Sequence, residues 1–399
     1  MYSRAAIEAA YAAYERAFAA VPHRICYALK ANSSHALLKI LAGLGAGADI
    51  VSGGELRAAL RAGFPPERIV FSGVGKTDPE IALGVEQGIG EFNAESETEI
   101  TRISAAAAAA GRTVRVSLRV NPDIDARSHP YISTGLRDNK FGVDIRIAAD
   151  LLRRARLRPG IEISGVQCHI GSQITDLDPL RRAAGELVAL SKTLLAEGFA
   201  LRTVDIGGGL GIDYTTDAPP PVDAFADTVL PMLAGLPLTV LLEPGRSLVA
   251  RAGVLLTRVV VVKENHGKRF VIVDAGMNDL MRPALYDAYH RIETVTAAEE
   301  TPAVVDVVGP VCESSDVIGR DLEEFVAHHP LQRCLSLHSY LGSGALESLI
   351  SAPSKPSSNS SSSASKRAPM LVAFASRCSR NCVQASAHAC PKLSASQMS

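Results

Sequence analysis

The sequence predicts an α/β protein in which a TIM-like (β/α)8 barrel is followed by a β-rich C-terminal domain. Between Arg24 and Arg246, strand-like apolar runs alternate with helical patterns, and after Arg246 β-branched runs follow one another without intervening helices. A doubly wound sheet is the competing topology, but it would normally use fewer strands and show one glycine-rich fingerprint near its start. We therefore expect a barrel at 1–250, a partial β domain at 251–325 and an atypical tail at 326–399.

The elements of the barrel are expected in regular order. The opening MYSRAAIEAAYAAYERAFAA predicts an amphipathic helix, because it lacks the apolar stretch of a signal peptide. Asn32-Ser33-Ser34 is typical of the cap of a helix that begins near His35. Further helical patterns lie at 54–62 and along the alanine run after Ser104. The expected strands are 24–29, 48–52, 68–73, 90–95, 114–121, 165–171, 203–208 and 238–243.

The region after the barrel predicts an antiparallel β domain and then a segment without order. Strand-like runs lie at 254–263, 269–274 and 304–308, and a further segment reaches Cys312. Serine dominates 351–366, and such tracts cannot bury enough apolar surface to order themselves. The end of the tail, 370–399, holds three cysteines, but their spacing matches no zinc module, so we expect no metal site. These cysteines are Cys378, Cys382 and Cys390.

Composition narrows the class of protein. The formal net charge is −1 and hydrophobic residues make up 47% of the chain, so we expect no nucleic-acid surface. No run approaches the roughly 20 apolar residues that a membrane span needs. The seven cysteines show no paired spacing, which favours a reduced, cytoplasmic protein over a disulfide framework.

Lys30 ends the first expected strand, in Tyr27-Ala28-Leu29-Lys30-Ala31-Asn32. The carboxyl ends of barrel strands are where catalytic groups collect. A lone lysine at such a position is usually a solvated surface charge. The alternative is a Schiff-base lysine whose ammonium is partly desolvated, so that the neutral amine is accessible.

Polar residues follow nearly every expected strand, and their convergence on one rim is typical of a barrel active site. Gly207-Gly208-Gly209-Leu210-Gly211 would let backbone N–H groups approach an anion, although a plain tight turn is equally possible. His169 is either a core histidine or a ring that lies on a flat cofactor. Glu243 needs a cationic or N–H partner if it is buried. The polar residues at the strand ends are Lys30, Asp49, Ser52, Ser72, Asn93, Glu95, Arg119, Asn121, His169, Ser172, Glu243 and Arg246.

Six motifs of the chain together resemble the diaminopimelate decarboxylase family, a fold-type-III, alanine-racemase-like group of enzymes that use pyridoxal 5'-phosphate. The resemblance runs from about residue 4 to 322, and it implies a barrel, a β domain and a homodimer with shared active sites. It also implies loss of CO₂ from the D-centre of meso-2,6-diaminopimelate, which gives L-lysine. The motifs are YALKAN (27–32), HIGSQ (169–173), DIGGGLGIDY (205–214), EPGRSLVARAG (243–253), DAGMNDLMRPALYDAYH (274–290) and GPVCESSD (309–316).

The resemblance also implies roles for individual residues. Lys30 would form the internal aldimine with the cofactor, Glu243 would keep the pyridine nitrogen protonated, and His169 would stack on the ring. Cys312 and Glu313 would reach the active site of the partner subunit, where Cys312 protonates the substrate carbon and Glu313 binds the distal ammonium. The expected phosphate-binding residues are Ser172, Gly208, Gly209, Gly245 and Arg246, and the expected substrate-binding residues are Arg246, Arg282, Tyr286 and Glu313.

The chain departs from the family pattern after Gly319-Arg320-Asp321. Family members continue into a further part of the β domain with a GAYG-type motif, whose tyrosine contacts cofactor and substrate. Here the nearest tyrosine, Tyr340 in SYLGSG, has different surroundings. We therefore expect an incomplete β domain with unpaired edges, which predicts lower stability, weak dimerisation and low turnover.

Other functions stay open at this point. Related decarboxylases act on ornithine, arginine or carboxynorspermidine, but they tend to carry an aspartate beside the cysteine, whereas Cys312 is followed by Glu313. A non-catalytic homologue is a third reading. A zinc or magnesium hydrolase is disfavoured, because no His-x-His pair follows an expected strand.

Overall fold

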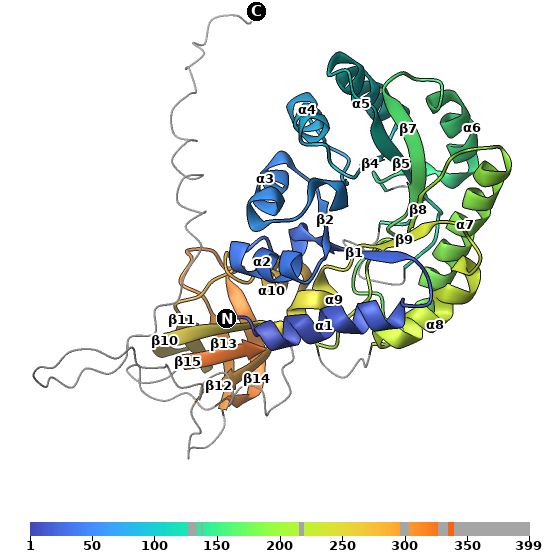
Figure 1. The fold of residues 1–399 in the computed structure, drawn as a ribbon. Coiled ribbons are helices and arrows are strands. Elements are labelled where there is room, and N and C mark those ends of the chain that lie inside the picture. The colour runs from blue at the N-terminus through green and yellow to red at the C-terminus, as the bar shows by residue number, and fades with distance from the viewer. Residues whose placement is uncertain (127–133, 137–138, 215–218, 296–302, 326–333, 339–399) are drawn as a thin grey trace, which may run out of the picture. The chain divides into compact units, whose positions relative to one another are not determined.

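A computed structural model describes residues 1–126, 134–136, 139–214, 219–295, 303–325 and 334–338. Eight parallel strands close into a barrel in the order β4-β3-β2-β1-β9-β8-β7-β5, and pairing of β4 with β5 completes the ring (Figure 1). The predicted barrel is therefore confirmed. The strands are β1 (His23–Ala28), β2 (Gly47–Ile50), β3 (Ile69–Phe71), β4 (Glu91–Ala94), β5 (Val114–Asn121), β7 (Ile161–Gln167), β8 (Thr203–Asp205) and β9 (Thr239–Leu242).

Helices connect successive barrel strands and lie on the outside of the ring (Figure 1). Local sequence fixes their ends: Ser52 caps α3 by accepting the N–H of Glu55, and Gly63 ends it at a φ of 97°. The helices are α1 (Arg4–Ala17), α2 (His35–Gly43), α3 (Gly53–Ala62), α4 (Asp78–Gln87), α5 (Glu97–Ala109), α6 (Ile145–Ala155), α7 (Leu177–Ala196), α8 (Val222–Leu233) and α9 (Arg246–Val249). A short strand, β6 (Val143–Asp144), adds to β5.

The predicted bounds of the sixth strand, 165–171, were wrong, because the structure places this strand, β7, at Ile161–Gln167. The prediction took Gly165 as the start of the strand, whereas this glycine lies inside it. A Cβ at Gly165 would approach the Oγ1 of Thr203 on β8 to 2.2 Å, so the close pairing of β7 with β8 requires a residue without a side chain. The glycine therefore marks close approach between strands and not a strand end.

The β domain forms a second sheet with the order β12-β15-β10-β11-β13-β14. The expectation of a purely antiparallel domain was wrong, since β11 and β13 pair in parallel. A strand also occurs beyond residue 325, where the predicted domain ended: β15 pairs with both β10 and β12. The rest of the predicted tail lies outside the described residues. The strands are β10 (Val254–Asn265), β11 (Lys268–Val273), β12 (Arg291–Thr294), β13 (Ala303–Val308), β14 (Val317–Phe325) and β15 (Cys334–His338), and α10 (Arg282–Tyr286) precedes β12.

Each sheet has its own hydrophobic core. The larger core fills the barrel and the space beneath its helices, and a smaller one, centred on Val271 and Val307, lies in the β domain. The first residues of the chain join the β domain, because Met1 and Val254 exchange backbone hydrogen bonds. Among the described residues, no helix is long and apolar enough to cross a membrane.

Candidate active site

The carboxyl ends of the barrel strands bring Lys30, Asp49, His169 and Glu243 to one rim, as the sequence predicted. Lys30 lies in a short 3₁₀ turn directly after β1, and Asp49 lies near the end of β2. His169 follows β7, and Glu243 follows β9. All these strands are parallel, so their carboxyl ends share one face of the barrel.

Lys30 forms an ion pair with Asp49, whose carboxylate is fully buried. The Lys30 Nζ donates to Asp49 Oδ2 over 2.9 Å, and 45% of the lysine side chain stays accessible. Desolvation lowers the pKa of Lys30, but the charges of Asp49 and Glu243 outweigh it and raise the pKa on balance. In the cofactor-free chain the raised pKa favours the charged ammonium of Lys30. Lys30 must give up a proton before it can act as a nucleophile, and Asp49 is the carboxylate in contact with it.

A second lysine of the barrel, Lys76, offers a comparison. Its Nζ donates to the carbonyls of Gly73 and Asn93, both at 2.8 Å, and to Glu99 Oε1 at 2.6 Å. Desolvation lowers the pKa of Lys76 despite the attraction of Glu99. All three N–H bonds of this fully buried ammonium are used, so Lys76 has a structural role. Lys30 is the accessible amine of the two.

Glu243 is buried, and the side chains that donate to it among the described residues are all neutral. Gln167 Nε2 donates to Oε2 over 2.9 Å, and Asn93 Nδ2 and Ser72 Oγ donate to Oε1 over 3.2 and 3.4 Å. Burial, followed by the charge of Asp49, raises the pKa of Glu243 to about 7. The sequence predicted a cationic or an N–H partner for Glu243, and Gln167 was not among the predicted residues. Its signal is a polar residue at the carboxyl end of β7.

Asp205 is a second buried carboxyl group beside Glu243, and it was also not among the predicted site residues. Its Oδ1 accepts the N–H of Gly207 over 2.8 Å, while its buried Oδ2 has no donor among the described residues. Burial, together with the charge of Glu243, raises the pKa of Asp205 well above its usual range. A negative charge on Glu243 therefore disfavours a second negative charge on Asp205.

The raised pKa of Glu243 predicts a specific pH dependence of stability. A carboxyl group whose pKa rises from 4.5 to about 7 on folding stabilises the protein fully below pH 4.5, and that stabilisation is lost as the pH rises through about 7. The loss is on the order of 3 kcal/mol, since one pKa unit corresponds to about 1.4 kcal/mol. Urea unfolding of the cofactor-free wild type and of Glu243→Gln, from pH 4.5 to 8, measures this difference. Parallel pH profiles for the two proteins would contradict it.

His169 is held as a neutral ring on the same rim. Gly208 N donates to His169 Nδ1 over 3.3 Å, and Thr134 Oγ1 donates to the backbone carbonyl of His169 over 2.6 Å. Burial, with smaller effects of Lys30 and Arg119, lowers the pKa of His169 well below its usual value. Because Nδ1 accepts a hydrogen bond, the proton of the neutral ring is on Nε2. A flat uncharged ring of this kind suits stacking on an aromatic ligand.

The glycine loop after β8 has no space for side chains. A Cβ at Gly208 would lie 2.1 Å from the carbonyl oxygen of Glu243, and one at Gly209 would lie 2.3 Å from that of Gly171. Gly209 also has a φ of 105°, which favours glycine. Gly245 packs against Ala31, where a Cβ would meet the alanine Cβ at 3.0 Å. The loops after β8 and β9 therefore require glycine at these positions, because their backbones pack closely against neighbouring segments.

Gly208→Ala tests this loop. The added methyl group collides with a backbone carbonyl that cannot rotate away, so the loop must shift. We expect the affinity for pyridoxal phosphate to fall at least about tenfold, which corresponds to roughly 1.4 kcal/mol. Gly185→Ala is the matched control, because on α7 the new Cβ meets only Met232 Sδ at 3.6 Å. Equal cofactor affinity in both variants, measured by fluorescence titration, would contradict the role of the loop.

Arg246 donates hydrogen bonds to side chains that follow β7 and β8 in the chain. Its Nη2 donates to Ser172 Oγ over 3.1 Å and its Nη1 to Tyr214 Oη over 2.7 Å. Arg282, at the start of α10, lies over the Tyr214 ring. Tyr286 lies on the same helix and interacts electrostatically with Arg282. Neither arginine forms an ion pair with a carboxylate of the described residues. Two partly buried guanidinium groups without a counterion are suited to bind an anionic ligand.

Cys312 and Glu313 lie apart from these residues within one chain. Both are exposed in the loop between β13 and β14. Asp316 fixes this loop by accepting the N–H groups of Val311 over 2.7 Å and Met277 over 2.6 Å. Among the described residues, no hydrogen bond or ion pair joins Cys312 or Glu313 to Lys30, so one chain alone does not bring the predicted proton donor into contact with Lys30. 

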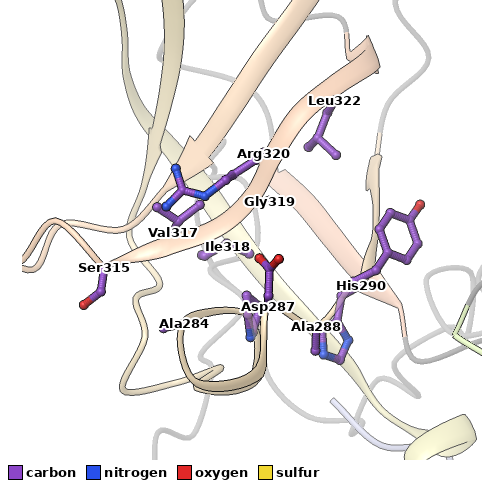
Figure 2. Close-up of a pocket in the computed structure, with 12 residues that line it drawn as sticks. Ala284, Asp287, Ala288, His290, Ser315, Val317, Ile318, Gly319, Arg320 and Leu322 are labelled. Atoms are coloured by element: carbon purple, nitrogen blue, oxygen red, sulfur yellow. The ribbon is translucent and has the colours of Figure 1, made fainter. Parts of the chain in front are cut away.

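A pocket of the β domain lies between α10 with its following loop and β14 (Figure 2). It has a volume of about 280 Å³, and His290 and Arg320 line it. Lys30 and Glu243 are not among its lining residues, so this pocket is distinct from the rim of the barrel. In the part of the chain that the structure describes, no cluster of side chains is arranged to hold a metal ion.

Comparisons with known proteins match this arrangement. The family model described as "Pyridoxal-dependent decarboxylase, pyridoxal binding domain" matches residues 4–250. A diaminopimelate decarboxylase of Neisseria meningitidis is 49% identical over 321 residues, which cover 80% of this chain and 79% of the relative. One of Pseudomonas aeruginosa is 47% identical over 340 residues, which cover 85% and 82%.

Solved structures give the same result. The crystal structure of diaminopimelate decarboxylase from Helicobacter pylori complexed with L-lysine has a TM-score of 0.81 and 44% identity, and covers 84% of each chain. The arginine decarboxylase of Paramecium bursaria Chlorella virus, at 20% identity and a TM-score of 0.74, shares the fold. The chain thus belongs to the pyridoxal-dependent decarboxylases and, among them, to the diaminopimelate decarboxylase family.

Proposed function

We propose that this protein uses pyridoxal 5'-phosphate to remove CO₂ from meso-2,6-diaminopimelate and release L-lysine. The observation that carries the proposal is the rim on which an accessible amine, Lys30, lies with the buried carboxyl of Glu243 and the glycine loop. Relatives that are named for this reaction share nearly half of the residues over four fifths of the chain.

The residues present fit the cofactor. The aldehyde of pyridoxal phosphate needs an amine, for which Lys30 is available, and its phosphate needs N–H donors and a cation. The loop with Gly208 and Gly209, Gly245, and the side chains of Ser172 and Arg246 would supply these. Glu243 would accept a hydrogen bond from the protonated pyridine nitrogen, and His169 would lie on the ring. When bound, the cofactor supplies an electron sink for the negative charge left on the substrate carbon by the departing CO₂.

The remaining predicted residues would hold the substrate. Arg246, Arg282 and Tyr286 would bind the carboxylate that is not lost, since guanidinium groups bind carboxylates through paired hydrogen bonds. Glu313 would bind the distal ammonium, and Cys312 Sγ would protonate the substrate carbon. Because Cys312 and Glu313 are exposed and apart from the rim of their own chain, we propose that a second copy supplies them in a homodimer.

Mixing two inactive variants tests the shared site. Lys30→Ala removes the amine from one chain, and Cys312→Ala removes the thiol supplied to the other. Random mixing should restore about a quarter of the wild-type activity, because half of the dimers are mixed and each has one intact site of two. Activity that stays at the level of the separate variants would contradict the shared site.

The proposal also includes a cytoplasmic location, supported by the free thiols of Cys26, Cys168 and Cys312 among the described residues. The departure from the family pattern after Arg320 still predicts a weak dimer and low turnover. A stable dimer by sedimentation, together with rapid CO₂ release, would contradict that part.

The substrate is tested by CO₂ release from the full chain supplied with pyridoxal phosphate. Meso-2,6-diaminopimelate, ornithine, arginine and carboxynorspermidine are compared at equal concentration. We expect release from diaminopimelate alone, with an equal amount of L-lysine. Faster release from another compound would favour the related decarboxylases, whereas cofactor binding without release from any of them would favour a non-catalytic homologue.

A further inference from the structure

Tyr214 lies against both arginines of the predicted substrate site. Its hydroxyl accepts from Arg246 Nη1 over 2.7 Å. The Cζ of Arg282 lies 4.1 Å from the centre of the Tyr214 ring, and that of Arg246 lies 5.8 Å from it. One aromatic residue thus contacts two cations, through its hydroxyl group and through its ring.

His290 completes the contacts of Arg282. Its side chain is buried, its Nε2 lies 3.0 Å from Arg282 Nη1, and its ring meets that of Tyr214 edge-on with 5.2 Å between centres. Burial, together with the charges of Arg282 and Arg246, lowers the pKa of His290 to about 4. The ring is therefore neutral at pH 7, so Nε2 accepts the hydrogen bond and adds no third positive charge.

The two neutral residues hold the cations without neutralising them. Burial is the main cause that lowers the pKa of Arg282, and the nearby charge of Arg246 lowers it further, whereas Tyr214 acts in the opposite direction. The Nε atoms of Arg246 and Arg282 are buried and have no hydrogen-bond partner within the described structure. A carboxylate in place of Tyr214 or His290 would pair with the arginines and occupy the donors that a ligand needs.

We propose that Tyr214 and His290 are positioning residues that hold Arg246 and Arg282 together as one receptor for the substrate carboxylate that is not lost as CO₂. The inference rests on the proposed function and deepens it. According to this proposal, these four side chains make the enzyme prefer amino acids that carry a second carboxylate. Tyr214 fixes both arginines, and His290 fixes Arg282.

Ligand binding to the cofactor-loaded full chain tests the proposal. L-lysine retains the second carboxylate, whereas cadaverine, otherwise the same molecule, lacks it. Loss of one hydrogen bond to a charged group should weaken L-lysine binding about tenfold in Tyr214→Phe and His290→Phe and leave cadaverine binding unchanged. Tyr214→Leu also removes the aromatic ring that lies against Arg282, so it should weaken L-lysine binding further. Equal losses for both ligands would overturn the proposal.

Conservative variants separate positioning from general damage. His290→Gln restores a neutral acceptor for Arg282 and should recover most of the L-lysine affinity. Tyr11→Phe, on α1, removes a hydroxyl away from the cluster and should have no effect on either ligand. In steady-state kinetics, Tyr214→Phe should raise KM for diaminopimelate with little change in kcat. A fall in kcat at constant KM, or failure of His290→Gln to recover binding, would overturn the positioning role.

A second measurement needs neither cofactor nor activity, so it separates failure of this inference from failure of the proposed function. If the Tyr214 hydroxyl holds Arg246, Tyr214→Phe should lower the midpoint of urea unfolding in the wild-type background. The same substitution should have no effect in the Arg246→Met background. An equal shift in both backgrounds would overturn the inference even if the enzyme is active. A lower midpoint in the wild-type background alone would support the inference even if CO₂ release is not observed.

Discussion

Replacing Lys30 by alanine should lower kcat for decarboxylation by at least about a thousandfold, the upper part of the range for loss of a group that reacts directly. Lys30 is the accessible amine on the rim, whereas Lys76 has all its N–H bonds engaged within the barrel. Stopped-flow or steady-state CO₂ release measures the effect.

Lys30→Arg is needed beside Lys30→Ala, because the alanine variant leaves the buried Asp49 without its cation. Removing one partner of a buried pair can cost about 3–5 kcal/mol of stability, which would confuse loss of fold with loss of chemistry. Arginine keeps the positive charge near Asp49 but cannot form the covalent bond. Both variants should be inactive, while Lys39→Ala, at an exposed position on α2, should retain full activity. Activity in Lys30→Arg close to wild type would contradict a covalent role.

Glu243→Gln should lower kcat by about 10²–10³-fold, the range found when one preorganised electrostatic group is removed from an active site. Glutamine has the shape of glutamate but lacks its charge, so it cannot stabilise a protonated pyridine nitrogen. The existing donors from Gln167, Asn93 and Ser72 would also face an amide with only one acceptor oxygen.

Glu91→Gln is the matched control for Glu243→Gln. Glu91 is also a buried carboxyl of the barrel, but it lies at the start of β4 and accepts from Ser164 Oγ over 2.8 Å and from Thr203. Any effect of Glu91→Gln should appear in stability and not in kcat. A similar fall of kcat in both variants would show that loss of a buried charge anywhere in the barrel is harmful, which would contradict a specific role of Glu243.

The rim was predictable because a barrel imposes a simple rule on sequence. Polar residues that follow apolar strands must meet on one face when the strands are parallel, and Lys30, His169 and Glu243 do so. The charge state of Lys30 was not predictable. It depends on the balance between burial and the charges of Asp49 and Glu243, which only the folded arrangement sets.

Some residues at the observed strand ends were harder to find. Gln167 and Asp205 are the last residues of β7 and β8 but lie inside the strands expected at 165–171 and 203–208, and only the closed barrel shows that both belong to the surroundings of Glu243. Tyr214 and His290 are 76 positions apart by their numbers, and no local pattern indicates that they share Arg282. The parallel pairing of β11 with β13 likewise depends on long-range contacts that a strand pattern does not encode.

The covalent assignment of Lys30 is tested most directly by borohydride reduction of the cofactor-loaded chain followed by peptide mass mapping. Reduction makes the bond between cofactor and lysine permanent, so the modified residue can be located. We expect one pyridoxyl group per chain, on the peptide that contains Lys30, and no label on Lys76. A label on Lys76, or an unlabelled Lys30 peptide in a chain that releases CO₂ from diaminopimelate, would contradict the role of Lys30.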